Sequence, residues 1–224
     1  MSFRSSQLLC FTMFSVLVIS EVVVPVITYR SVFPSINIDV GKFMYSGREE
    51  GEVVQVNPEL NTTATVPPIP PFQRYSLGKG IEEAIRVFGK APLLPKWLPE
   101  SMKYAEVYIG PVVLICFSDR VVSDFTFDNI SIEVTGDTNP PSVEELKKEE
   151  LSWRTYGWNL KLIQVGDIWI TFSEKASLGP YGDEIFGPSP LAIFWTGNLY
   201  YIMSAGSPLT PQDLIKIIES MTTT

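Results

Sequence analysis

Alternating apolar and polar positions predict an antiparallel β-sheet in the second half of the chain. Three pairs of apolar runs are each joined by a short glycine-containing turn, and they span residues 104–109 and 112–118, 160–165 and 168–173, and 191–196 and 199–204. Gly166 and Gly197 open two of the turns, where hairpin turns of the II′ type need positive φ. A seventh strand is predicted over 129–134, where isoleucine and valine alternate with polar residues. Because no helical pattern separates the partners of a hairpin, the pairing is expected to be antiparallel.

Helical spacing of apolar residues predicts a helix at each end of this region. The first helix lies between Gly80 and Gly89 and carries Ile81, Ala84, Ile85 and Phe88. In the last helix Thr210 suits the N-cap and Pro211 the first position, and the apolar stripe is Leu214, Ile217, Ile218 and Met221. A shorter helix is predicted over 142–151, opened by a capping box. The predicted fold is α+β: a curved antiparallel sheet of about seven strands built from hairpins, with the N- and C-terminal helices packed on one side.

The first apolar run, residues 8–28, predicts a membrane segment. Its uninterrupted part is about 13 residues long, the length of a signal-peptide apolar region. With the valine-rich stretch after Glu21 it reaches about 20 residues, enough for a helix to cross a bilayer. The segment is therefore either an uncleaved anchor or a signal peptide cleaved after Ser20. The first alternative predicts a single-pass protein of the cell membrane with its C-terminal domain outside, and the second predicts a secreted protein.

The chain is predicted to have three parts: residues 1–28 at the membrane, a Pro-rich extracytoplasmic tether over 29–75, and an α+β domain over 76–224. The stretch from Val66 to Pro71 favours extended polyproline geometry, which is typical of a semi-rigid spacer. N-glycosylation sequons begin at Asn61, in a polar stretch, and at Asn129, at the start of a predicted strand.

Charge and composition remove several function classes. The chain of 224 residues has a formal net charge of −8 and contains no histidine. The negative charge argues against nucleic-acid binding. The lack of histidine removes serine–histidine and cysteine–histidine catalysis and the commonest metal ligand, and no cofactor is predicted. Cys116 is the only cysteine after the apolar run, so no internal disulfide is expected there, and its apolar neighbours are typical of a buried residue.

Large aromatic residues are the most informative candidates for a binding site. Antiparallel sheets bury alternate aromatic residues, so most of these rings are expected in the core. If the helices leave part of the concave sheet face uncovered, however, the rings would line an apolar groove. The candidate groove residues are Trp97, Trp153, Trp158, Trp169 and Trp195, with Tyr181 and Phe186 from the Gly- and Pro-rich loop 176–190.

Three segments carry a resemblance to a known family. They are residues 94–100 (LPKWLPE), residues 193–201 (IFWTGNLYY) and the closing helix 209–221, which ends in IESM. The region from about residue 78 to residue 222 resembles an uncharacterised extracytoplasmic domain of archaea and bacteria, which in bacteria accompanies anti-sigma-factor and sporulation-associated membrane proteins. That family is similar in turn to the half-barrel of periplasmic lipoprotein carriers, which bind acyl chains or peptides. The resemblance implies a fold and an outside location, and it implies no reaction.

Three functional hypotheses follow. The first is a non-enzymatic, membrane-tethered domain that binds an envelope protein, a peptide or an apolar ligand. The second is an exported hydrolase that uses carboxylates, which would need two acidic residues converging in one pocket. The acidic residues around 119–128 and 144–150 have no such spacing and are interpreted as solvated side chains. The third is a structural component of the envelope.

Overall fold

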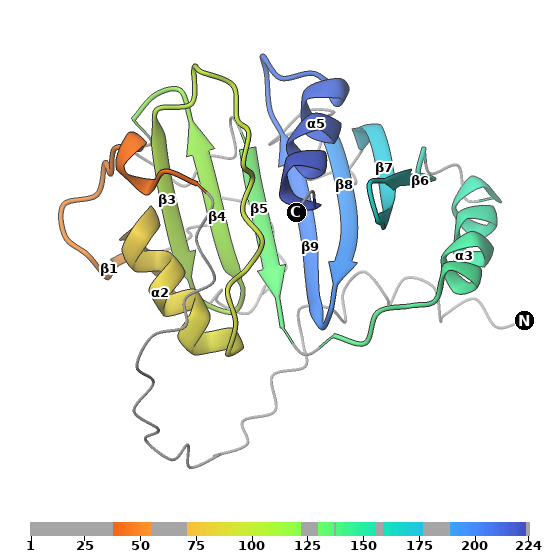
Figure 1. The fold of residues 1–224 in the computed structure, drawn as a ribbon, viewed down its shortest axis with the longest axis horizontal. Coiled ribbons are helices and arrows are strands. Elements are labelled where there is room, and N and C mark those ends of the chain that lie inside the picture. The colour runs from red at the N-terminus through yellow and green to blue at the C-terminus, as the bar shows by residue number, and fades with distance from the viewer. Residues whose placement is uncertain are drawn as a thin grey trace, which may run out of the picture. The chain divides into compact units, whose positions relative to one another are not determined.

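The computed structural model describes residues 38–54, 71–121, 130–136, 138–155, 159–176 and 189–222 (Figure 1). The chain divides into two compact units, Met1–Phe33 and Pro34–Thr224, and every described residue belongs to the second unit. The predicted membrane segment, residues 8–28, lies outside the described residues. Within the ranges given above, no helix is long and apolar enough to cross a bilayer.

The described residues form one open antiparallel sheet of nine strands. The strands are β1 (Glu52–Val54), β2 (Phe72–Ser76), β3 (Tyr104–Ile109), β4 (Val113–Ser118), β5 (Ile130–Thr135), β6 (Lys161–Val165), β7 (Ile168–Ala176), β8 (Ser189–Thr196) and β9 (Leu199–Ala205). Their order across the sheet is β1-β2-β3-β4-β5-β9-β8-β7-β6. Two meanders, β1 to β5 and β6 to β9, are therefore joined by the pairing of β5 with β9.

The α+β class, the antiparallel pairing and all seven predicted strands are confirmed, but the expected strand count is wrong. The two additional strands are β1 and β2, which lie in the 29–75 segment that the sequence assigned to a tether, apart from Ser76 at the end of β2. Both strands are short. They form because β2 pairs with β3 and β1 then pairs with β2. The folded unit consequently begins well before Ser76.

Two helices cover one face of the sheet, as predicted. Helix α2 (Leu77–Phe88) packs on β2 and β3, and helix α5 (Pro211–Thr222) packs on β6, β8 and β9 (Figure 1). We call this side the helix face, and its core contains Ile81 of α2, Ile217 of α5, and the strand residues Val107, Ile115, Ile132, Phe194 and Met203. The opposite side, the far face, carries the alternate strand residues, among them Glu106, Leu114, Glu133 and Trp195. Helix α3 (Val143–Thr155) contacts β6 at the end of the sheet, and η1 (Val40–Lys42) is a single 3-10 turn.

The helix ends agree with the capping signals except at the start of α2. Thr210 and Asp213 exchange side-chain-to-backbone hydrogen bonds at the start of α5, and Ser142 and Glu145 do so at the start of α3. Helix α2 begins at Leu77 rather than after Gly80. Gly80 instead lies inside the helix, where an added Cβ would come within 2.2 Å of Val107 Cβ. The glycine therefore serves close packing of α2 on β3.

The two turn glycines have the predicted positive φ. Gly166 and Gly197 adopt φ of 55° and 61°, and Gly89 ends α2 with φ of 71°. These values lie in the left-handed region that glycine enters without steric cost.

Candidate functional site

An aromatic row lies on the far face where β9, β8 and β7 pair. Tyr200 of β9 is directly opposite Trp195 of β8, and their ring centroids are 4.7 Å apart. Trp169 of β7 precedes Ile170, and Trp195 follows Phe194, and Ile170 and Phe194 are paired across the two strands. Because side chains alternate along a strand, both tryptophans point to the far face. Tyr200 is buried, whereas both indole side chains keep partial solvent exposure. The Lys147 ammonium of α3 lies 5.6 Å from the Trp169 ring centroid.

Glu133 places a carboxyl group among apolar side chains of the same face. The register sets it between Leu114 of β4 and Ile202 of β9. Among the described residues, no hydrogen bond or ion pair engages its carboxyl group. Burial raises the pKa of Glu133, because a carboxylate loses hydration there without gaining a partner. Nearby, the hydroxyl groups of Ser131 and Ser204 are hydrogen-bonded to each other at 2.7 Å.

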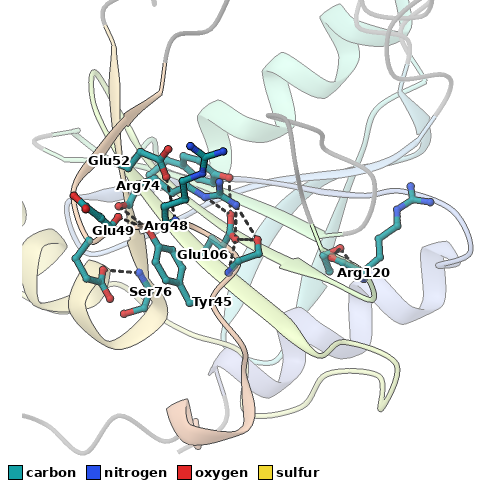
Figure 2. Close-up of polar contacts among 12 residues, drawn as sticks. Tyr45, Arg48, Glu49, Glu52, Arg74, Ser76, Glu106 and Arg120 are labelled. Carbon is teal, nitrogen blue, oxygen red and sulfur yellow. Dashed lines mark hydrogen bonds and ion pairs between the residues drawn. The ribbon is translucent and has the colours of Figure 1, made fainter.

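A buried ion pair occupies the other end of the far face, at the β2–β3 edge. Arg74 Nη2 lies 2.6 Å from Glu106 Oε1, and Arg74 Nε donates to Oε2 at 2.9 Å. Both residues are buried, with exposed fractions of 8% and 1%. The Tyr108 hydroxyl donates to Oε2 at 2.7 Å, and the backbone N–H and hydroxyl of Ser46 both donate to Oε1. Figure 2 shows Arg74 and Glu106 directed toward each other beside Tyr45, with Arg120 well apart from them.

The electrostatics of this pair are internally satisfied. Burial by itself would raise the pKa of Glu106, but hydrogen bonds from Arg74, Ser46 and Tyr108 outweigh it and hold the pKa below its usual range. The guanidinium lies between two rings, with its Cζ 5.9 Å from the centroids of both Tyr45 and Tyr108. Burial, with the nearby Glu50 carboxylate, raises the pKa of Tyr45 to about 12. The arrangement holds fixed charges that compensate each other, so it is built for structure rather than for proton transfer.

Cys116 faces Glu106 across the β3–β4 pair. Its residue exposure is intermediate, so the buried position predicted from its apolar neighbours is found in part. Burial first, and the Glu106 carboxylate second, raise the pKa of the thiol. A thiol that resists ionisation is a poor nucleophile, in agreement with the structural role predicted for it.

Trp97, the first of the predicted groove residues, lies on the helix face. It packs against the main core, and the Lys216 ammonium of α5 is 3.6 Å from its ring centroid. Ser220 Oγ accepts hydrogen bonds from the backbone N–H groups of Lys96 and Trp97, both at 3.1 Å. On the same face the Tyr201 hydroxyl accepts from Leu93 N–H at 2.9 Å. Two of the segments that carried the family resemblance, 94–100 and the closing helix, therefore contact each other, and Leu93 joins the same loop to β9.

The structure places some of the predicted groove residues next to each other and others on opposite faces of the sheet. Trp169 and Trp195 are neighbours on the far face, and Trp97 is on the opposite side of the sheet, so these three do not line one groove. The Trp153 side chain and the residues Trp158, Tyr181, Phe186, Asn61 and Asn129 lie outside what the structure describes. Within the described ranges, no group of three or more Cys, Asp or Glu side chains is placed to hold a metal ion.

Sequence reasoning missed the residues with the most unusual environments. Arg74 fell in the segment interpreted as a tether, and Glu106 and Glu133 occupy polar positions of alternating strands that are ordinarily solvated. The available signal was β4, whose residues 113–117 are apolar at both alternating sets of positions. Such a strand is buried on both faces, so polar residues beside it on β3 and β5 are expected to be buried as well.

No family model, no curated protein and no solved structure matches the chain.

Proposed function

We propose that the chain is a membrane-anchored, extracytoplasmic binding domain without enzymatic activity, and that its far face takes an apolar chain. The observation that carries this proposal is the aromatic row Tyr200–Trp195–Trp169 beside Glu133, whose carboxyl group has no partner among the described residues. Partly exposed indole rings, together with Ile193 and Ile202 on the same face, offer the apolar lining that is typical of lipid and small-molecule sites. A single polar group within such a lining can orient the head of an amphiphile.

The location rests on the sequence. We infer that the apolar segment 8–28 either anchors the chain with its C-terminal part outside or is cleaved as a signal peptide. The resemblance to an extracytoplasmic family, and through it to half-barrel lipoprotein carriers, supports both the location and the class of ligand. The open antiparallel sheet with helices on one face is compatible with such a half-barrel.

A carboxylate-dependent hydrolase is the second candidate, and one observation favours it. Glu106 and Glu133 lie on the same face with pKa values moved in opposite directions, as in an acid–base pair. However, the register separates them by two strands and two residues, roughly 12 Å between Cα atoms. Glu106 is also fully engaged by its partners. Binding therefore ranks first.

Photo-crosslinking of the full chain in its own membrane tests the proposal. A palmitate analogue with a diazirine in its acyl chain is supplied, the membranes are irradiated, and the adducts are mapped by peptide mass spectrometry. We expect adducts on peptides from β7, β8 and β9, reduced severalfold by Trp195→Ala. Val87→Ala, an exposed apolar residue of α2, is the matched control and should leave them unchanged. Adducts confined to residues 8–28 would contradict the proposal.

A further inference from the structure

Residues 38–54, which we call the strap, are integrated into the fold. Ile38, Val40 and Phe43 pack against the core of the helix face. The Phe43 and Phe117 rings meet edge to face, with centroids 5.4 Å apart. The strap therefore contributes three apolar side chains to the main core, although the sequence placed it in a tether.

Backbone hydrogen bonds hold the strap to two neighbouring strands. Met44 N–H donates to Lys103 C=O at 2.8 Å, and Ala105 N–H donates to Met44 C=O at 3.2 Å. Farther along, Gly51 N–H donates to Arg74 C=O at 2.8 Å, and β1 then pairs with β2. These contacts place the strap along the β2–β3 edge.

The buried ion pair completes the attachment. Arg74 Nη2 donates to Ser46 Oγ at 2.8 Å, while Ser46 donates twice to Glu106. Tyr45 lies over the guanidinium, and its hydroxyl donates to Arg74 C=O at 3.3 Å. Ser46 and Tyr45 belong to the strap, whereas Arg74 and Glu106 belong to β2 and β3. Withdrawal of the strap would thus remove two donors from a buried carboxylate, which is costly.

The chain between β1 and β2 adds nothing to the reach of a tether. Val54 and Phe72 are paired residues, so the two ends of the stretch 55–71 lie side by side at the sheet edge. The Pro-rich stretch 66–71 that predicted a spacer belongs to these residues. The covalent path from the N-terminal segment to the folded unit therefore ends at Ile38.

We propose that the strap is a non-covalent clasp that joins the N-terminal segment to the folded unit, so that a chain cut between β1 and β2 stays in one piece. Ser46, Arg74 and Glu106 form its polar contact, and Phe43 its apolar contact.

The test cuts the folded full chain, purified in a mild detergent, at an engineered site. A flexible insert with a protease recognition sequence is placed between Asn61 and Thr62, with different tags at the two ends of the chain. After complete cleavage, confirmed on a denaturing gel, the N-terminal tag is captured under native conditions. The C-terminal fragment is expected to remain bound and to elute only in denaturant. Its immediate loss in buffer would overturn the proposal, and this readout is independent of any membrane role.

Substitutions in the clasp distinguish specific attachment of the cut fragment from non-specific association. Ser46→Ala and Phe43→Ala are each expected to speed release of the cut fragment about tenfold. Val53→Ala, an exposed position 58% accessible in β1, should leave the release rate unchanged. The same insert between Ser35 and Ile36 should free the folded unit at once. Equal release rates for Ser46→Ala, Phe43→Ala and Val53→Ala would also contradict the clasp.

Discussion

Two glutamates on one face of the sheet show how neighbours decide the behaviour of a carboxyl group. Glu106 is less exposed to solvent than Glu133, yet its pKa is lowered because Arg74, Ser46 and Tyr108 all donate to it. Glu133 has Leu114 and Ile202 beside it, and burial raises its pKa. The first carboxylate stabilises the fold above its unfolded pKa and loses that effect as pH falls. The Glu133 carboxyl group contributes in the opposite direction: it favours the folded state at low pH and loses that effect as pH rises.

Glu133→Gln is therefore expected to stabilise the protein near neutral pH by about 1 kcal/mol, because it places a neutral amide where the wild type holds a charged carboxylate. Because the folded-state pKa of Glu133 is raised, the contribution of this residue to stability is fully present below its unfolded pKa. It declines as pH rises through the folded pKa. Glutamine does not titrate, so the advantage of the variant should vanish below about pH 4. Urea unfolding followed by tryptophan fluorescence, at neutral and acidic pH, measures both values. A variant less stable than wild type at neutral pH would show that the carboxylate has a partner.

At the scale of elements, turn residues and apolar–polar alternation predicted the hairpins, whose two strands are adjacent in the sequence. The glycine turns and the alternation of 104–118, 160–173 and 191–204 yielded the three hairpins within a few residues, because each is closed by its own turn. Strands β1 and β2 gave no such signal. β1 has only three residues, and the two strands form because β2 pairs with β3 and β1 with β2. The same limit applies to the site. Alternation places Trp195 and Trp169 on one face, whereas the face of Trp97 depends on a loop held by Ser220.

Gly80 is the residue that allows α2 to lie close to β3. Gly80→Ala should destabilise the protein by about 1–3 kcal/mol, because the new Cβ would overlap the Val107 side chain and force the helix away. Gly78→Ala, two residues earlier in the same helix, is the matched control, since its Cβ would approach only Val40 Cγ1, at 3.2 Å. Its gain in helix propensity should offset most of that contact. Equal effects of the two substitutions in urea unfolding would show that close packing at Gly80 is unimportant.

At the scale of the whole molecule, the parts follow one another in a single order along the chain. The apolar segment 8–28 comes first and the strap follows, the strap contacts the buried ion pair, and a nine-stranded sheet presents one face to two helices. The proposed ligand would contact the aromatic row and Glu133 on the far face. Every functional step in this order assumes that the folded unit lies outside the cell membrane.

Labelling of intact cells with a membrane-impermeant maleimide tests that assumption most directly. Val87→Cys puts a thiol on the exposed surface of α2, where the side chain is 58% accessible, and the wild type reports any background from Cys10 and Cys116. The account predicts that the variant is labelled in intact cells well above the wild type and that permeabilisation adds little. Labelling of the variant only after permeabilisation would contradict it.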